Sequence, residues 1–397
     1  MKWMRRFLAL ALACLLLAGT CAGCAKTEGG TDAQETGETE QAVETGFSDA
    51  GTTESTTLED APSFKFGFIH TSFSDQLGIM YQKYAQYAAD QLGCEIIFTE
   101  ATDTDSRMAA VQNMIEMGCQ GIINTTISES MLQLCEDAGV YYIQVGNTIS
   151  DPELAAFAAD SEFFLGSCLV DNYQVGRNMV DALYEQGCRK LAFMEFTPGT
   201  VTTMDDRADG MHDAAEAYSD LEIVTEYTGA ANTFGDGAEQ ILASYGAEID
   251  GIVAVMANAS IAASIYSYGL SDQIKYAGVD IQEGTDELLE AGTMAYVAGG
   301  AYPNGEIAVA MLYNYLTDYK IWTDDEDITR PLIELQSVED YDNYMKYFEG
   351  DLPCYTGDEL KTIVGLYNPD VTMEDVRALA ADSSIESCVE RHAGLIE

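Results

Sequence analysis

The sequence FKFGFIHTSFSDQLGIMYQKYAQYAADQLGCEIIF, residues 64–98, contains two short runs separated by a longer segment with a different period. Residues 66–69 and 95–98 favour β-strands, because both runs are short and rich in aromatic or β-branched side chains. The apolar residues between them recur at helical spacing; they are Ile79, Met80, Tyr84, Tyr87, Ala88 and Leu92. The stretch therefore predicts a strand–helix–strand unit. Apolar strands joined by helices belong in a parallel sheet that helices cover on both sides.

The same alternation continues along the chain. Strands are predicted at 121–124 and 141–145, with helices that begin near Asp105 or Ser106 and at Glu129. After a less regular stretch, 148–170, the alternation restarts, and strands are predicted at 191–194, 223–224, 251–255, 275–279 and 294–298, with helices between them. The predicted fold class is therefore α/β, with two doubly wound parallel-sheet lobes.

The C-terminal part has a different pattern. It predicts a helix over 305–316, a strand over 331–336 and then a helical tail. In the tail, a stripe of aromatic residues at helical spacing is interpreted as packing; it consists of Tyr341, Tyr344, Tyr347 and Phe348. Thr372 and Asp375 have the spacing of a capping box and predict the start of the last helix.

The N-terminal residues 1–23 have the order of a secretory signal peptide. Lys2, Arg5 and Arg6 precede an apolar run, 7–17, that is short for a membrane span, so we expect export. The sequence LAGTCAGC, residues 17–24, resembles a bacterial lipobox, and Cys24 is the predicted lipidation site. Cleavage before Cys21 is one alternative, and a soluble secreted protein is another. Residues 24–63 carry few large apolar side chains and predict a disordered acidic linker behind the lipid.

Composition restricts the partners. The chain has 397 residues and a formal net charge of −49, with 18 Lys and Arg against 67 Asp and Glu. Its length exceeds one ordinary core and favours two packed domains. So acidic a protein repels a phosphate backbone and an anionic membrane surface, so we expect no nucleic-acid partner. Membrane attachment must then be covalent or through an apolar segment.

Seven of the ten cysteines follow the proposed anchor: Cys94, Cys119, Cys135, Cys168, Cys188, Cys354 and Cys388. An odd number cannot pair completely within the chain, and no Cys or His spacing predicts a metal site. We interpret them as small buried side chains and leave open one or two disulfides.

The sequence carries no enzyme motif. It lacks GxSxG, HExxH, P-loop and GxGxxG runs. The three histidines are His70, His212 and His392, and a lone histidine at these positions is more often structural than catalytic. With 67 acidic residues, carboxylate pairs arise by chance. We therefore expect no catalytic residues, no metal and no cofactor.

Polar and aromatic residues follow several predicted strands at their carboxyl ends, where open parallel sheets bind ligands. They are Phe73, Asp75, Asn147, Arg207, Asn258 and Asp280. Carboxylates and amides suit hydroxyl groups, and an aromatic face suits the C–H face of a sugar. Each residue has a structural alternative: Arg207 in a surface ion pair with Asp205 or Asp206, Asn258 and Asp280 as helix caps, and Phe73 and Phe234 in the core.

Several stretches together resemble the sugar-binding branch of the type I periplasmic binding proteins. The matching stretches are AQYAADQLG (85–93), VQ (111–112) through GIIN (121–124), DNYQVG (171–176), RADGM (207–211) and GVD (278–280), within a likeness that spans about 64–338. The resemblance implies two lobes joined by three hinge crossings, near 170–171, 299–300 and 335–337. It divides the chain into 64–170 plus 300–335 for the first lobe and 171–299 plus 336–397 for the second lobe with its C-terminal extension. Repressors with the same body carry a DNA-binding headpiece, where this chain has an export signal.

The resemblance also implies ligand-binding positions. Phe73, Asp75 and Leu77 fall in the first ligand loop, and Arg207 and Asp280 match the family's Arg and Asp. Phe234 falls near an aromatic position of the second lobe, and Asn258 is within one register step of an Asn. The chain departs from the family where an Asp-Arg pair becomes Gly146-Asn147, where paired aromatics become Leu77-Gly78, and at Gly299. These departures leave the ligand open.

The expected function is that of a lipid-anchored solute-binding protein on the outer face of a bacterial cytoplasmic membrane. It would be a monomer that captures a sugar or similar polar small molecule and delivers it to the permease of an ABC importer. The alternatives are a receptor that presents the liganded form to a membrane kinase or chemoreceptor, and a secreted acidic hydrolase.

Overall fold

The computed structural model describes residues 61–324, 326–350 and 352–393. The predicted signal peptide, Cys24 and nearly all of the predicted linker lie outside these residues. Within the described part of the chain, no helix has both the length and the apolar character needed to cross a bilayer.

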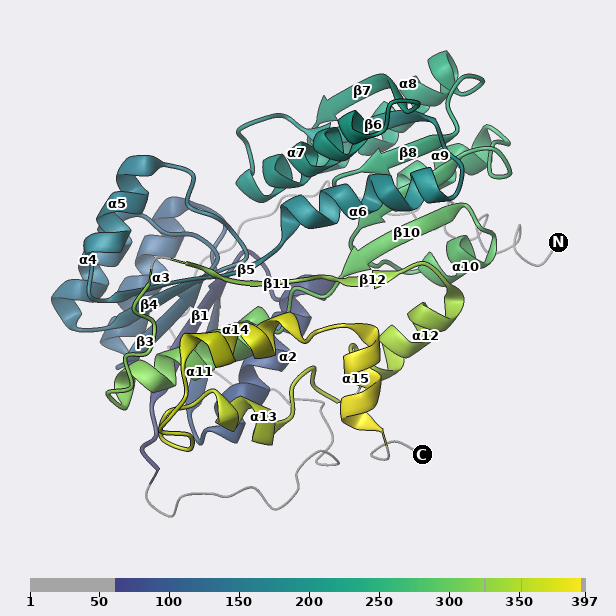
Figure 1. Ribbon diagram of the computed structural model, residues 1–397. Coiled ribbons are helices and arrows are strands. Elements are labelled where there is room, and N and C mark those ends of the chain that lie inside the picture. The colour runs from purple at the N-terminus through teal and green to yellow at the C-terminus, as the bar shows by residue number, and fades with distance from the viewer. Residues whose placement is uncertain (1–60, 325, 351, 394–397) are drawn as a thin grey trace, which may run out of the picture. The chain divides into compact units, whose positions relative to one another are not determined.

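The first sheet grows from the stretch that opens the sequence analysis. Its order is β11-β5-β4-β3-β1-β2, and every neighbouring pair is parallel (Figure 1). The strands are β1 (Lys65–His70), β2 (Glu95–Glu100), β3 (Gly121–Asn124), β4 (Tyr141–Val145), β5 (Phe164–Val170) and β11 (Ile328–Arg330). With α2 (Gln76–Gln91), α3 (Thr104–Glu116), α4 (Glu129–Ala138), α5 (Pro152–Asp160) and α11 (Asn304–Leu316), this sheet forms what we name the first lobe.

The second sheet has the order β12-β10-β9-β8-β6-β7 and is parallel except for the antiparallel pair β10–β12. The strands are β6 (Lys190–Phe196), β7 (Glu222–Gly229), β8 (Gly251–Ala254), β9 (Lys275–Val279), β10 (Met294–Gly299) and β12 (Ile333–Leu335). With α6 (Asn172–Glu185), α7 (Thr202–Ala217), η2 (Ala231–Thr233), α8 (Phe234–Tyr245), α9 (Ala259–Ser267) and α10 (Thr285–Glu290), it forms the second lobe. The predicted α/β class with two doubly wound lobes is confirmed.

Side-chain caps explain where some helices begin. Asp103 caps α3 in a capping box with Ser106, so the helix starts before the predicted residues Asp105 or Ser106. Thr372 and Asp375 form the predicted capping box at the start of α14 (Met373–Ala381), which confirms that prediction.

The chain passes between the two sheets three times, after β5, after β10 and between β11 and β12. The third crossing differs from the expected position near 335–337. The single strand predicted over 331–336 is in fact β12 alone, and β11 precedes it on the other sheet. Pro331 separates the two strands and explains the break, because proline has no N–H to donate to a sheet ladder.

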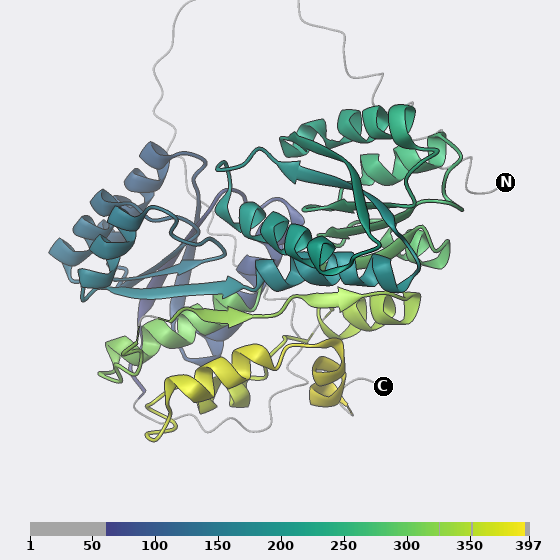
Figure 2. The same ribbon diagram turned by 45° about the horizontal axis from the view of Figure 1, so that its top comes forward.

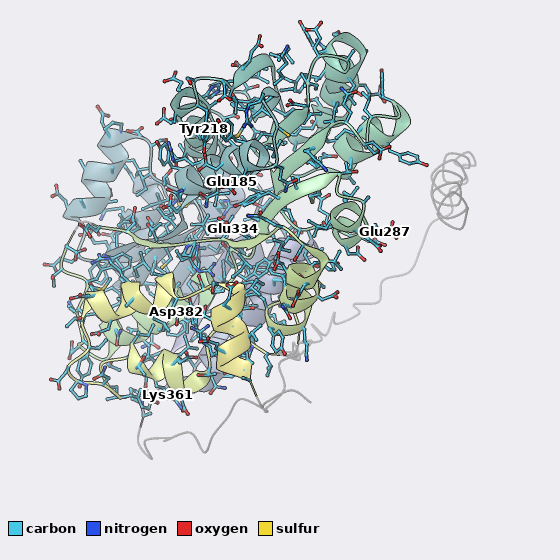
Figure 3. The ribbon with its side chains drawn as sticks, turned by 45° about the vertical axis from the view of Figure 1, so that its right-hand side comes forward. Glu185, Tyr218, Glu287, Glu334, Lys361 and Asp382 are labelled. Atoms are coloured by element: carbon cyan, nitrogen blue, oxygen red, sulfur yellow. The ribbon has the colours of Figure 1, made fainter. Side chains whose placement is uncertain are left out.

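Arg330 connects all three crossings. It is fully buried, its carbonyl accepts from the Asp171 N–H (3.0 Å), and its Nη1 donates to the Gly300 carbonyl (2.6 Å). Nearby, Glu334 of β12, labelled in Figure 3, accepts from Asn178 of α6 (2.5 Å). These bonds fix the crossing segments to one another.

The C-terminal extension consists of α12 (Val338–Tyr347), α13 (Gly357–Thr362), α14 and α15 (Ile385–His392). The sequence placed residues 336–397 with the second lobe, but the contacts divide them. Helix α12 packs on second-lobe elements, β12 and α10, whereas α13 packs on α2 and α11, and α14 packs on β11 (Figures 1 and 2). The reason is α11, whose residues 304–315 are all buried, so that it needs apolar cover on every side. Asn314 of α11 reinforces this packing, because it donates to the Ile363 carbonyl (2.8 Å) and accepts from the Gly365 N–H (2.7 Å).

Two glycines let α6 and α7 approach closely. A Cβ at Gly176 of α6 would lie 2.0 Å from the carbonyl oxygen of Arg207, and a Cβ at Gly210 of α7 would lie 2.0 Å from the carbonyl oxygen of Tyr173. Each glycine therefore contacts the backbone of the opposite helix. The stretches 171–176 and 207–211, both noted in the sequence, are the two sides of this contact.

Candidate functional site

Arg207 lies within α7, one turn after the helix begins, and not at the loop end where the sequence placed it. Its side chain is buried, with 4% exposed. Nη2 donates to Asn172 Oδ1 (2.5 Å) and Nη1 donates to the Val255 carbonyl, while the buried Nε has no hydrogen-bond partner. Burial lowers the pKa of Arg207 to about 10, so it remains a cation at neutral pH. These partners differ from the surface ion pair with Asp205 or Asp206 that was the alternative.

Asp280 follows β9 directly. It has a φ of 85°, a left-handed conformation that is uncommon outside glycine but tolerated by Asp and Asn. The residue is accessible to solvent, yet protein atoms surround the carboxyl group closely enough to raise its pKa. The charge of Arg207 opposes that rise, so the two groups interact electrostatically. A left-handed non-glycine backbone at a strand end, with a carboxyl group whose charge interacts with that of a buried cation, is typical of a functional position.

The other two second-lobe predictions have structural roles. Asn258 caps α9, because its Oδ1 accepts from the Ser260 N–H (2.8 Å), and its Nδ2 donates to the Ala231 carbonyl (3.3 Å). The Phe234 ring is fully buried against Phe196 and Tyr227, with centroids at 5.5 and 6.3 Å. A ring without exposed surface does not present a face to a solute in this arrangement.

The first-lobe predictions lie after β1 and β4. The half-buried Phe73 ring lies 5.2 Å from Phe98 and 5.7 Å from His70. Asp75 caps α2 by accepting from the Gly78 N–H (2.8 Å), and Leu77 is 40% exposed in the first turn of that helix. Asn147 donates its Nδ2 to the Thr125 carbonyl (2.7 Å).

Sequence reasoning missed Arg107, which organises the carboxyl edge of the first sheet. The buried guanidinium donates to Asn124 Oδ1 (2.6 Å), Thr125 Oγ1 (3.1 Å) and Thr71 Oγ1 (2.9 Å). Because Asn147 binds the Thr125 carbonyl, it joins the same group. A helical arginine next to predicted capping residues was the only signal, and helical periodicity does not indicate which strand end such a side chain reaches. Each lobe thus has a buried arginine at the carboxyl edge of its sheet.

The histidines make local structural contacts. His70 is buried with its ring beside Phe73 and Tyr81, and burial lowers its pKa. His212 Nε2 lies 2.8 Å from Glu195 Oε1, and His392 Nε2 lies 2.6 Å from the Pro353 carbonyl oxygen. Among the described residues, no group of His, Cys, Asp and Glu has the arrangement of a metal site.

A family model described as a periplasmic binding protein domain matches residues 66–320. The chain belongs to this family. Its members bind solutes and are not enzymes, which excludes the hydrolase alternative. The family resemblance inferred from the sequence is therefore confirmed, and β11, β12 and the C-terminal extension lie beyond the matched residues.

Solved structures share the fold. A solute-binding protein of an ABC transporter from Actinobacillus succinogenes 130z, with bound D-allose, has a TM-score of 0.60 and 21% identity over 70% of this chain and 99% of its own. The arabinose-binding component from Shewanella sp. ANA-3, bound to L-arabinofuranose, has a TM-score of 0.61 and 19% identity over 71% and 95%. A protein from Bacillus halodurans C-125 with bound myo-inositol has a TM-score of 0.57 and 22% identity over 72% and 99%. A comparison with curated proteins found no match.

Proposed function

We propose that the protein is an exported solute-binding lipoprotein that captures a sugar or similar polyhydroxylated small molecule between its two lobes and delivers it to an ABC importer. The observation that supports this most directly is the pair Arg207 and Asp280 at the carboxyl edge of the second sheet. Arg207 keeps an unpartnered Nε, and Asp280, an exposed residue after β9, has a carboxyl group whose charge interacts with that of Arg207. The family's fold and the sugars bound by structural neighbours agree with this reading.

The chemistry of the pair suits hydroxyl groups. A guanidinium only donates hydrogen bonds and a carboxylate only accepts them, so together they satisfy both functions of a sugar hydroxyl. Phe73, which is half-buried after β1, offers a ring for a C–H face. In the first lobe, Asn147 and the Arg107 group supply further polar atoms at the carboxyl edge. The proposed ligand site therefore combines Arg207 and Asp280 with Phe73, Asp75, Leu77, Asn147 and Asn258.

A thermal-shift screen of the purified protein tests the binding function. A ligand at one hundred times its Kd stabilises the native state by about 2.7 kcal/mol, which corresponds to roughly 4 °C for a chain of this size. We expect such a shift with one or a few monosaccharides, polyols or nucleosides, and none with amino acids. A screen in which no hydroxylated metabolite raises the Tm would contradict the proposal. Co-purification of the liganded protein with a permease, and not with a kinase, then supports delivery to an importer.

The lipid anchor has its own test. If Cys24 is acylated, Cys24→Ala should accumulate as unprocessed precursor or appear in the medium, because no lipid holds it to the membrane. Fractionation and mass measurement of the N-terminus distinguish these forms, and Cys21→Ala is the matched control. Normal processing and membrane retention of Cys24→Ala would assign the anchor elsewhere.

A further inference from the structure

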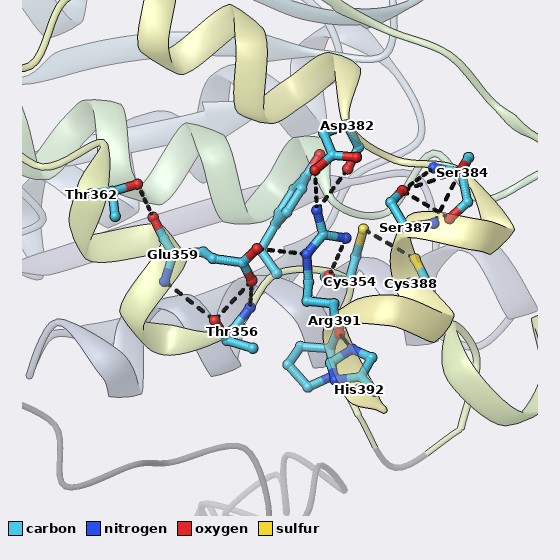
Figure 4. A network of polar contacts seen from close by, with 12 residues as sticks. Cys354, Thr356, Glu359, Thr362, Asp382, Ser384, Ser387, Cys388, Arg391 and His392 are labelled. Atoms are coloured by element: carbon cyan, nitrogen blue, oxygen red, sulfur yellow. Dashed lines mark hydrogen bonds and ion pairs between the residues drawn. The ribbon is translucent and has the colours of Figure 1, made fainter. Parts of the chain in front are cut away.

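Cys354 and Cys388 lie side by side in the C-terminal extension. Cys354 precedes α13 and Cys388 is on α15, and both side chains are fully buried. Their Sγ atoms are 3.9 Å apart although the residues are separated by 34 positions in the sequence (Figure 4). A disulfide needs these sulfurs at about 2.05 Å. Side-chain rotation can supply much of this approach, because the two sulfurs already face each other.

A polar network holds the two segments in place. Arg391 lies one turn after Cys388 on α15. Its Nε–H donates to Glu359 Oε1 (2.6 Å), and its Nη1 donates to the carbonyl of Cys354 itself (3.2 Å). The neighbouring His392 ring contacts the Pro353 carbonyl oxygen (2.6 Å). Figure 4 shows these groups around the two sulfurs. Residues one turn after Cys388 are thus tied to the segment around Cys354 independently of the sulfurs, which holds the two thiols side by side.

The thiols differ electrostatically. The hydrogen bond with Cys354 lowers the pKa of Cys388 in spite of burial, and the charges of Arg391 and Arg330 act in the same direction. Burial raises the pKa of Cys354. In the docked arrangement Cys388 is therefore closer to the reactive thiolate form than Cys354.

We propose that Cys354 and Cys388 form the disulfide of this protein, by exchange with an external low-molecular-weight or protein disulfide. The Cys388 thiolate attacks one sulfur of the external disulfide, a mixed disulfide forms, and one external thiolate leaves and takes up the proton from Cys388. Cys354 then attacks the Cys388 sulfur, the intramolecular bond forms, and the second external thiol leaves with the remaining proton. Two protein thiols are oxidised and one external disulfide is reduced to two thiols.

The burial of both sulfurs sets the order of events. Cys388 is carried by α15, so exchange takes place before this helix docks, and the docked helix then shields the bond from reductants. Export, which the proposed function requires, brings the folding chain into a compartment where external disulfides persist. The disulfide therefore depends on export and on the geometry of the two cysteines, and not on any ligand.

The other described cysteines leave Cys354 and Cys388 as the pair to expect, because none of them contacts another cysteine sulfur. Cys94, Cys119, Cys135, Cys168 and Cys188 are buried, and among the described cysteines no further sulfur–sulfur contact occurs. One pair and five single thiols account for the odd number seven. The disulfide would close the loop that contains α13 and α14, the helices that cover α11 and β11.

Differential thiol labelling of protein exported by a bacterial host tests the proposal. The protein is unfolded without reductant and alkylated with iodoacetamide, then reduced and labelled with N-ethylmaleimide. We expect the second label on Cys354 and Cys388 alone, and the first label on the five other cysteines. Iodoacetamide on both Cys354 and Cys388 would overturn the proposal, whatever the outcome of the ligand screen.

A second measurement uses stability. Reduction in denaturant, followed by refolding with reductant, should lower the Tm of the wild type by about 5 °C, because the closed loop no longer restricts the unfolded chain. The double variant Cys354→Ser with Cys388→Ser should show no response to reductant. Cys135→Ala, which alters a buried cysteine that contacts no other cysteine sulfur, should keep the full response. A reductant response that survives in the double variant would assign the disulfide to other cysteines, and the labelling of wild type decides even if that variant fails to fold.

Discussion

Replacing Asp280 by Asn should weaken binding of the ligand found by the screen about ten- to a hundredfold, because a charged hydrogen-bond partner in a site contributes about 1.5–3 kcal/mol. The Tm of the unliganded protein should change little, since the residue is accessible to solvent. Asn also tolerates the left-handed backbone at this position, so the substitution removes the charge without adding strain. Calorimetric titration and thermal denaturation of the same preparation separate the two effects.

Arg207→Ala should reduce affinity at least as much, but it should also destabilise the fold. The substitution leaves Asn172 Oδ1 and the Val255 carbonyl without their donor in a buried position, which costs about 2–4 kcal/mol of unfolding free energy. Arg207→Lys keeps the positive charge but loses the planar set of guanidinium donors, so it tests the geometry of these donors separately from the charge. Asp209→Asn, an exposed change on the same helix, is the matched control and should keep wild-type affinity. Wild-type dissociation constants in both Asp280→Asn and Arg207→Lys would remove the centre of the proposed site.

The sequence predicted those parts of the fold that depend on local period and local caps. The unit β1-α2-β2 follows from residues 64–98, and the capping box at Thr372 and Asp375 identifies the start of α14. The sequence placed Arg207 where a helix begins, whereas the residue lies one turn inside α7. The start of α7 could not be predicted, because Val201 precedes it and makes no side-chain cap. Asp280 could be predicted at a strand end, whereas its left-handed backbone could not.

Long-range contacts account for what the sequence did not reveal. The aromatic stripe in the sequence predicted packing, and Tyr344 and Phe348 are indeed buried. The stripe could not predict that the Tyr84 hydroxyl of α2 donates to the Phe348 carbonyl. The same limit hid Arg107, whose partners at Thr71, Asn124 and Thr125 come from two different strand ends. The spacing of apolar residues identifies the buried face of a helix or strand, whereas the element that packs on this face depends on how the whole chain folds. The pairing of Cys354 with Cys388 belongs to the same class.

Gly176→Ala should lower stability and ligand affinity together. The added methyl group would lie 2.0 Å from the Arg207 carbonyl oxygen, an atom of the backbone that no rotamer change can move away. The helices α6 and α7 must separate, at a cost of about 3 kcal/mol or more, since the strain falls on packed backbone. The displaced helix segment carries the Arg207 side chain away from Asn172 and Val255, so binding weakens although no ligand contact is mutated.

Gly305→Ala is the control for this prediction. Gly305 is also a buried helical glycine, but its added Cβ would meet its nearest neighbour, Ala85 Cβ, at 3.4 Å, an ordinary contact. It should therefore be neutral or slightly stabilising, because alanine restricts the unfolded chain. Wild-type Tm and affinity in Gly176→Ala would show that α6 and α7 do not need this close approach.

The double variant Gly176→Ala with Gly210→Ala provides the sharper test. Gly210→Ala places its methyl group 2.0 Å from the Tyr173 carbonyl oxygen, so it should separate the same two helices from the other side. Once one methyl group has moved the helices apart, the second meets less resistance, and the combined loss of unfolding free energy should fall clearly short of the sum of the single losses. Denaturant titration of the four proteins measures this coupling. Strictly additive losses would mean that the two glycines act at independent contacts. They would contradict the prediction that both methyl groups separate α6 from α7 and thereby displace Arg207.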